Sequence, residues 1–566
     1  MPAPKKTKKG RAWQEIAREA QAIRDQTLAD VGATVTLPPR LPTNVITIPE
    51  KILSQGNIRI TSLSPQHIVS LTSHGKLSAQ EVVQAFLERA VVAQKLTNCV
   101  TGLLPQRAIS QAIELDARLP HDPVPLGPLH GLPVSIKSHI GIAGQPLASG
   151  YCASFHSRPR PTADALVVQI LTRAGAIIHA RSAEPQSMMQ LECTSNLYGV
   201  TTNPFSHIDL SSGGSSGGEG ALLALRGSVL GVGSDVGGSI RVPAAACGIY
   251  GLKPTAFRVP TTGWSSTPPG ADPIVTVLGP MSVSLEGLEM FMPVVAATES
   301  WHVEPAIIPL PWRTMQITPS RERPLRLGVL WHDEVVQLHP PIMRELREFT
   351  YKIKSLPHVE VQSFPAYKHD EAWAIISSLY CTDGGEADIA VMTESGEPLL
   401  PLTRWIMKEN PGVKKLSRSE LEYWLEEREE FRTEYLQHWN KTGYWNEASG
   451  SWESTVDAVV CPVAPGVATK HNTAKYWTYT AVWNLLDYPA LAFPAGKVDK
   501  NVDIKESRRR FMSGIDKENW QLYDAETFDE MPVGLQIVGR RFDEEKIIAI
   551  LKFLQDLTQL VSVIDE

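Results

Sequence analysis

Closely spaced cysteines are missing from this chain of 566 residues. Its six cysteines are scattered, and no two of them form a CxxC pair. Zinc sites and the disulfide frameworks of small secreted proteins both need a tighter spacing. The chain also lacks an HExxH motif, and its histidines show no spacing typical of metal ligands. We therefore expect no metal ion or other cofactor, and reduced cysteines buried in the core of a cytoplasmic protein.

Long apolar runs are missing as well. The best candidate, residues 547–563, is interrupted by Lys552 and Asp556, and its apolar residues recur at helical spacing. This pattern is typical of an amphipathic packing helix and excludes a membrane span. The N-terminus carries four lysines between residues 5 and 9 without an apolar stretch behind them, which excludes a secretory signal. We expect a solvated tail there rather than a nuclear address.

Neither sign of charge dominates the chain. Lys and Arg number 54 against 61 for Asp and Glu, which gives a formal net charge of -7. A mildly acidic protein is a poor non-specific partner for nucleic acid or an anionic membrane. Hydrophobic residues make up 43% and charged residues 20%, as in ordinary globular proteins. The composition therefore indicates a folded protein, and we expect no nucleic-acid partner and no membrane span.

Helix and strand patterns alternate over much of the chain. Ser78 and Glu81 form a capping box in front of a strongly helical pattern. Further helices are predicted over residues 12–29, 163–175 and 218–226. Strands are predicted over residues 129–137, 176–182 and 228–233. This alternation favours an α/β protein whose sheet is covered by helices on both faces.

Two stretches differ from this α/β pattern. Residues 1–60 read as an N-terminal tail, a helix and a proline-rich link, in front of one domain over residues 61–560. Within that domain, residues from about 300 to 450 are rich in charged and aromatic side chains. The pattern of residues 417–439 predicts a polar helix there. We expect this region to be variable, partly helical and peripheral.

Two clusters of glycine and serine are the most distinctive motifs. The first is SSGGSSGG at residues 211–218, and the second is GSDVGGS at residues 233–239. Neither cluster is followed by the GK[ST] of a phosphate-binding loop. The second begins like a dinucleotide-binding motif, but Val236 occupies the place of the third glycine. Flexible linkers are disfavoured because helix and strand patterns flank both clusters closely.

A serine nucleophile would use such glycines differently. It needs backbone N–H groups directed at the oxyanion, and consecutive glycines let these groups converge unobstructed. The segment Val236–Gly237–Gly238–Ser239 can supply them within one turn. The nucleophile also needs a base, and a lysine serves when burial keeps its amine neutral. Lys137 ends the apolar pattern PVSIK and is a candidate, although a lone lysine is most often a solvated surface charge.

Residues 211–255 closely resemble the defining segment of the amidase signature family, and residues 125–137 resemble its lysine segment. The most similar branch is the fungal acetamidase, or general amidase, group. The resemblance implies a single large α/β/α domain with a central mixed sheet covered by helices on both faces. The other matching segments are PQSM (185–188), NLYGVTTNP (196–204), CPVAPG (461–466), YTAVWNLLDYPALAFPAG (479–496) and PVGLQIVGRRFDEE (532–545).

This resemblance implies a catalytic triad. Ser239 takes the place of the nucleophile, Ser215 that of the serine held in a cis peptide, and Lys137 that of the base. Ser216 is the other candidate in the bridging cluster, and the family pattern favours the first serine of GGSSGG. Nothing in the local sequence distinguishes the two serines otherwise.

Further positions acquire roles from the same resemblance. Residues 236–239 match the oxyanion segment, and Met188 matches a substrate-contacting position of the animal fatty-acid-amide hydrolases. Three departures from the family pattern stand out. Ser138 follows the lysine where many members carry an acid, Ser234 replaces the usual threonine, and Arg181 replaces a common lysine.

The implied reaction is hydrolysis of a small-molecule carboxylic amide to the acid and ammonia or an amine, through an acyl-enzyme. A homodimer is a family expectation. One alternative is the glutamine-hydrolysing subunit of a tRNA-dependent amidotransferase, and another is a non-catalytic protein on the same fold. The intact set of one lysine and two serines disfavours the second alternative.

Several conspicuous residues near these motifs are expected to be structural. Arg241 is expected to form an ion pair, with Asp235 as the partner in reach, and Cys247 to lie in the core. Trp483 and Tyr488 either line a substrate entrance or pack in the core, as do the Trp and Tyr residues between 405 and 445.

Overall fold

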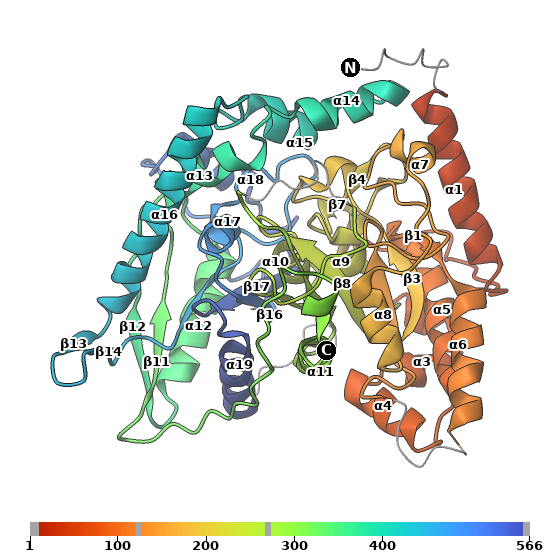
Figure 1. The fold of residues 1–566 in the computed structure, drawn as a ribbon, viewed down its shortest axis with the longest axis horizontal. Coiled ribbons are helices and arrows are strands. Elements are labelled where there is room, and N and C mark those ends of the chain that lie inside the picture. The colour runs from red at the N-terminus through yellow and green to blue at the C-terminus, as the bar shows by residue number, and fades with distance from the viewer. Residues whose placement is uncertain (1–10, 120–126, 266–272, 559–566) are drawn as a thin grey trace.

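Eleven strands join into one mixed sheet in the part of the chain that the computed structural model describes, residues 11–119, 127–265 and 273–558 (Figure 1). In spatial order they are β1 (Val100–Leu103), β3 (Ile177–Ser182), β2 (Pro133–Lys137), β8 (Leu230–Asp235), β10 (Val277–Ser282), β9 (Tyr250–Lys253), β16 (Ala490–Lys497), β17 (Pro532–Val538), β15 (Ala458–Pro462), β11 (Leu325–Val329) and β12 (Val359–Ser363). Strand β2 runs parallel to both of its neighbours, β3 and β8. Strand β8 then pairs antiparallel with β10.

Helices surround this sheet, and three short two-stranded ribbons lie outside it (Figure 1). The α-helices are α1 (Trp13–Ala29), α2 (Pro49–Ile52), α3 (Gln55–Thr61), α4 (Pro65–Ser73), α5 (Ala79–Thr97), α6 (Pro105–Arg118), α7 (Ser154–Ser157), α8 (Leu166–Arg173), α9 (Gly217–Ala224), α10 (Arg241–Ala246), α11 (Leu285–Ala296), α12 (Pro340–Lys354), α13 (His369–Tyr380), α14 (Glu386–Ser395), α15 (Pro401–Arg404), α16 (Arg418–Asn440), α17 (Thr478–Leu485), α18 (Gly514–Leu522) and α19 (Glu544–Thr558). The ribbons pair β4 (Thr194–Ser195) with β5 (Gly199–Val200), β6 (Thr202–Asn203) with β7 (Ser206–Ser211), and β13 (Tyr444–Asn446) with β14 (Ser451–Glu453).

Both faces of the sheet are buried. Successive residues of a strand point to opposite faces, so neighbouring residues show what covers each face. In β15, Val460 belongs to the largest apolar cluster, which also contains buried residues of α12 and α19. Its neighbours Val459 and Cys461 belong to a second cluster, with buried residues of α13, α16 and α17. The α/β fold with helices on both faces is therefore confirmed.

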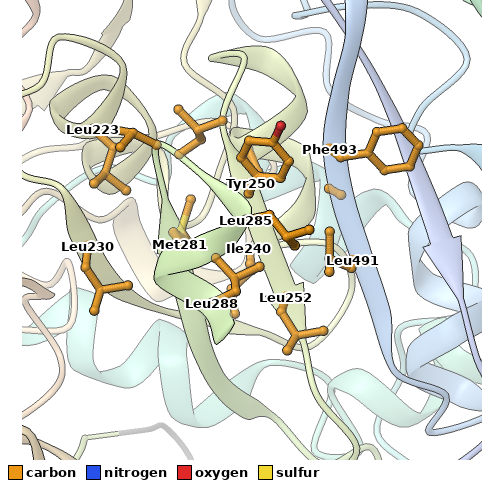
Figure 2. Packing of buried hydrophobic residues seen from close by; sticks show 14 of the residues in the cluster. Leu223, Leu230, Ile240, Tyr250, Leu252, Met281, Leu285, Leu288, Leu491 and Phe493 are labelled. Atoms are coloured by element: carbon orange, nitrogen blue, oxygen red, sulfur yellow. The ribbon is translucent and has the colours of Figure 1, made fainter. Parts of the chain in front are cut away.

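Part of the largest cluster joins the central strands to α11 (Figure 2). Leu230, Leu252 and Leu491 come from β8, β9 and β16, while Leu285 and Leu288 come from α11. Burying one leucine side chain stabilises a fold by about 1.5–3 kcal/mol. These contacts fix the position of β8, whose end leads into the second glycine–serine cluster.

The helices and strands indicated by the sequence are present, with ends shifted by a few residues. The capping box of Ser78 and Glu81 begins α5 as expected. The largest shift concerns the strand expected over residues 129–137, which begins only at Pro133. The reason is a turn in which the Leu132 N–H donates to the Leu129 carbonyl.

The region from 300 to 450 is only partly peripheral. Its first half supplies β11 and β12, which extend the central sheet at one end, and α12, which packs on the sheet. Helices α13 to α16 lie outside the sheet, and α14 and α15 cross toward the side of α1 (Figure 1). There the Glu397 carboxylate accepts a hydrogen bond from the Cys152 N–H at 2.8 Å. The sequence did not reveal β12 because it is an edge strand with mostly exposed residues. Strand β11 is mostly buried, and a short apolar run alone does not distinguish a strand from part of a buried helix.

Several expectations about the whole chain are met by the described residues. All six cysteines are buried and free. None of the helices in the described ranges has the length and apolar character needed to cross a membrane. The lysine-rich residues 1–10 and residues 559–563 of the predicted C-terminal helix lie outside the described residues. The domain boundary near residue 60 and the homodimer stay predictions.

Candidate active site

The two glycine–serine clusters and Lys137 meet at one edge of the central sheet. Strands β2 and β8 are parallel neighbours, so their carboxyl ends lie at the same edge. Lys137 is the last residue of β2, and Asp235 is the last residue of β8. The chain then turns through residues 236–240 into α10. We refer to residues 236–240 as the catalytic turn.

The first cluster reaches the same place from the N-terminus of α9. The peptide bond between Gly214 and Ser215 is cis, and Ser216 directly precedes α9, without a capping hydrogen bond from its side chain. Gly214 permits a very close approach, because a Cβ atom there would lie 2.4 Å from the backbone nitrogen of Glu192. A residue with a side chain would therefore push Ser215 away from the sheet edge.

Lys137 is fully buried and contacts Ser215 rather than Ser216. Its Nζ donates to Ser215 Oγ at 2.6 Å and lies 3.0 Å from Ser234 Oγ. Ser216 instead donates its hydroxyl to the Ser234 carbonyl at 3.3 Å. The two serines, which the local sequence does not distinguish, therefore have different partners. Ser234, noted in the sequence only as a departure from a family pattern, is a direct neighbour of the lysine.

Burial lowers the pKa of Lys137 to about 8. Negative charges nearby oppose this effect, and Glu184 is the strongest of them, followed by the groups of Cys193, Asp235 and Glu219. An amine with such a pKa is in part neutral near neutral pH, when its nitrogen can accept a proton. The contact with Ser215 Oγ places a hydroxyl in position to give one.

The catalytic turn is held by a buried ion pair. The Asp235 carboxylate contacts the Arg241 guanidinium at 3.0 Å, as expected from the sequence, and both side chains are fully buried. It also accepts hydrogen bonds from the N–H groups of Gly238 and Ile240, at 2.8 and 3.1 Å, and from Asn484 at 2.9 Å. Burial alone would raise the pKa of Asp235, but Arg241 and these donors hold it well below its usual range.

Two further hydrogen bonds orient the peptide groups of the turn. Tyr380 donates its hydroxyl to the Val236 carbonyl at 3.0 Å, and Thr480 donates to the Gly237 carbonyl at 2.6 Å. In a trans peptide the C=O and N–H groups point in opposite directions. The Gly237 N–H therefore points away from Tyr380. Sequence reasoning missed Tyr380 and Thr480, since neither lies near the turn in the chain.

Only part of the expected oxyanion segment has free donors. The Gly238 N–H is already bound to Asp235. The N–H groups of Val236, Gly237 and Ser239 have no hydrogen-bond acceptor within the described ranges. Backbone donors left free in a buried turn can bind a developing negative charge. Of the four backbone N–H groups expected from the sequence, these three are therefore available to bind an oxyanion.

The side chain of Ser239 lies in this turn and is buried. Its carbonyl accepts a hydrogen bond from the Ser216 N–H at 3.0 Å, which ties the two clusters together. No hydrogen bond joins the hydroxyl groups of Ser239 and Ser215 in the structure. The arrangement therefore contains the contact between Lys137 and Ser215, and leaves the Ser239 hydroxyl unengaged beside three free amides.

A buried pair of His139 and Glu184 lies next to Lys137. The Glu184 carboxylate accepts the backbone N–H of His139 at 2.9 Å, and the His139 ring lies 3.1 Å from the same oxygen. Burial lowers the pKa of His139. Ser138, between His139 and the lysine, donates to the Ser182 carbonyl at 2.8 Å. The sequence gave no signal for Glu184, because its partner is far away in the chain.

Met188, Cys247 and the aromatic residues are the remaining candidates from the sequence. Met188 ends a 3-10 turn (Gln186–Met188) and is half-buried, and no hydrogen bond or ion pair links that turn to the three candidate residues. Its substrate-contacting role stays a prediction. Trp439 and Trp483 are completely buried in one apolar cluster, together with Tyr488, so these residues pack in the core. Cys247 is also in the core.

A cavity of about 370 Å³ adjoins the site. Gly213, Val242 and Thr480 line it, and each belongs to or touches one of the segments described above. Lys137, Ser215 and Ser239 are not among its lining residues. The cavity thus borders the site without containing its polar groups. No group of His, Cys, Asp and Glu side chains in the described part of the chain is arranged to hold a metal ion.

Known proteins match the chain over nearly its full length. The family model described as Amidase matches residues 81–548. The chain is 34% identical to an acetamidase of Emericella nidulans over 95% of this chain and 97% of that protein. It is also 34% identical to an acetamidase of Aspergillus oryzae, over 96% and 99%. Among solved structures, a fatty acid amide hydrolase superposes with a TM-score of 0.89 at 29% identity, over 97% of this chain and 96% of the other.

The ion pair beneath the catalytic turn should dominate local stability. Replacing Asp235 by Asn removes one charge and leaves Arg241 buried without a counter-charge, so we expect a loss of about 3–5 kcal/mol. Denaturant unfolding followed by circular dichroism measures this loss. Asp209→Asn, at an exposed position of β7, is the matched control and should leave the midpoint unchanged. Equal midpoints for the two variants would contradict a structural role of the pair.

Proposed function

Since the chain belongs to the amidase family and is an amide-hydrolysing enzyme, we propose that it works through a triad of Ser239, Ser215 and Lys137. The proposed reaction converts a linear carboxylic amide to the carboxylic acid and ammonia or an amine. The observation that carries this proposal is the 2.6 Å contact of a fully buried lysine amine with Ser215, beside the turn that contains Ser239.

The proposed mechanism begins with the neutral amine of Lys137. It accepts the proton of Ser215 Oγ, which in turn takes the proton of Ser239 Oγ as that oxygen attacks the amide carbonyl. The C=O bond becomes a C–O⁻ group, which the free N–H groups of Val236, Gly237 and Ser239 stabilise. For this step Ser239 Oγ must turn toward Ser215.

Collapse of the tetrahedral intermediate breaks the C–N bond. Ser215 returns a proton to the departing nitrogen and recovers one from protonated Lys137, because an amide anion is a poor leaving group. The acyl group then remains as an ester on Ser239. Water attacks this ester after giving its proton to the same relay, and the acid leaves with Ser239 protonated again.

The similarity to two proteins named acetamidase suggests a small aliphatic amide as the first substrate to examine. We propose acetamide and its short-chain homologues as substrates. A panel of amides graded by acyl length, with ammonia release as the measured quantity, tests this choice. A maximum at long or aromatic acyl groups would contradict it while leaving amide hydrolysis intact.

Removal of the nucleophile or the base should abolish most of the activity. We expect Ser239→Ala and Lys137→Ala each to lower kcat by several orders of magnitude. Hydroxylamine added to the wild-type reaction should yield a hydroxamate, since it competes with water for the acyl-enzyme. Full activity in either variant would rule out the triad. Ammonia release from glutamine alone, rising with a partner protein, would favour the amidotransferase alternative.

Neighbouring serines provide a sharper test of the bridging residue. Ser215→Ala removes the only hydroxyl proposed to pass the proton between Lys137 and Ser239, so kcat should fall by several orders of magnitude. Ser216→Ala is the matched variant, one residue away, and removes two hydrogen bonds, one donated to the Ser234 carbonyl and one accepted from the Ser234 N–H, each at 3.3 Å. This variant should lower kcat by roughly tenfold or less. The reverse order of the two effects would transfer the bridging role to Ser216.

The pH dependence follows from the lysine. Only the neutral amine accepts a proton, so kcat/KM should rise with pH through the pKa of Lys137, which burial lowers to about 8. Glu184→Gln keeps the shape of the side chain and removes the negative charge that most strongly raises this pKa. The acid limb of the profile, the part where kcat/KM rises with pH, should therefore move to lower pH by roughly one unit.

Glu426→Gln is the matched control for this experiment, because Glu426 is an exposed residue of α16. Its acid limb should coincide with that of the wild type. An unchanged limb in Glu184→Gln, or a move to higher pH, would contradict the assignment of the limb to Lys137.

A further inference from the structure

Four arginines surround a cavity of about 590 Å³ outside the site described above. They are Arg428 and Arg432 on α16, and Arg540 and Arg541 just after β17. The acidic residues that line the same cavity are fewer, namely Glu429 and Asp487. The lining therefore carries an excess of positive charge in a chain that is acidic as a whole.

The two acids are already engaged by three of the arginines. Arg428 and Arg432 both donate to one oxygen of Glu429, each at 2.8 Å. Arg541 donates to Asp487 at 2.9 Å. No acid of the lining is left for the fourth guanidinium.

Arg540 is the unpartnered member of the set. Its guanidinium lies over the Trp439 ring, 5.4 Å from the ring centre, and forms no ion pair among the described residues. Its Nη2 atom is buried without any hydrogen-bond partner. Burial lowers the pKa of Arg540 and also that of Arg432. A buried donor on a cation without a hydrogen-bond partner is costly, so an anion that reached the guanidinium from the cavity would gain a charge-assisted contact.

We propose that this cavity is a binding site for a small anion, a carboxylate or a phosphate, whose oxygens accept hydrogen bonds from Arg540 and its three neighbours. A guanidinium presents parallel N–H donors that match the oxygens of both groups. A patch of solvated surface arginines would look different, because each head group would face water and none would be left buried and unpaired.

The cavity is connected to the catalytic turn through α17. Asn484 lines the cavity, donates to Asp235 at 2.9 Å and accepts from Arg241 at 2.6 Å. The next residue, Leu485, offers its carbonyl to Arg432 at 2.7 Å. An anion that draws the arginines together therefore acts on the helix that positions Asp235. We expect saturation of the cavity by an anion to change kcat. This expected change in kcat rests on the proposed function, whereas the binding of the anion does not.

The test titrates the full-length enzyme with inorganic phosphate and, separately, with acetate, at constant ionic strength set by potassium chloride. Calorimetry measures binding, and a thermal melt measures the stabilisation that binding to the native state must produce. We expect saturable binding of at least one anion. Saturation by phosphate alone assigns the site to phosphates, and saturation by both assigns it to carboxylates as well.

Arg540→Gln should weaken this binding by about tenfold or more, the loss expected for one charge-assisted contact. Arg418→Gln makes the same charge change on α16 at a side chain that is 91% exposed, and should bind like the wild type. Arg428→Gln provides a second cavity variant should Arg540→Gln fail to fold. The absence of saturable binding by both anions, or equal binding by Arg540→Gln and Arg418→Gln, would overturn the site. Binding without any change in kcat would overturn the connection to the catalytic turn.

Discussion

An amine kept out of water is the constraint on which the proposed active site depends. Lys137 is completely buried, and the cost of charging it there lowers its pKa to about 8. Such an amine needs neighbours that tolerate both of its protonation states. The hydroxyl groups of Ser215 and Ser234 do so, because a hydroxyl can accept a hydrogen bond from an ammonium group or donate one to an amine. The parallel pairing of β2 with β8 and the close approach at Gly214 bring these hydroxyls to the lysine.

A second buried charge holds the other half of the site. Asp235 accepts two backbone N–H groups of the catalytic turn while it is neutralised by Arg241, so the turn is fixed from beneath. The same carboxylate takes the Gly238 N–H, which leaves the amides of Val236, Gly237 and Ser239 for an oxyanion. Asn484 belongs to this network and also lines the arginine cavity, so α17 links the turn to that cavity.

The sequence predicted the parts of the molecule that depend on local patterns. The strand ending at Lys137, the turn from β8 into α10 and the capping box of α5 follow from periodicity, glycine placement and capping chemistry. Contacts between distant segments were out of reach. Ser215 and Ser216 differ in three dimensions by their partners, and Tyr380, which holds the Val236 carbonyl, lies in a helix 144 residues further along the chain. Strand β12 was missed because an exposed edge strand lacks a clear apolar pattern. Strand β11 is mostly buried, but a short apolar run alone does not distinguish a strand from part of a buried helix.

The charge that most strongly affects Lys137 comes from a segment distant in the chain. Glu184 reaches the neighbourhood of Lys137 from another segment, and its carboxylate accepts the backbone N–H of His139. Its charge opposes the effect of burial on Lys137 more strongly than any other group. Without this charge the amine would accept a proton less readily, although the proposed relay must also protonate the leaving nitrogen. A lysine with its pKa near the working pH serves both directions of transfer, and the buried pair of His139 and Glu184 helps to keep it there.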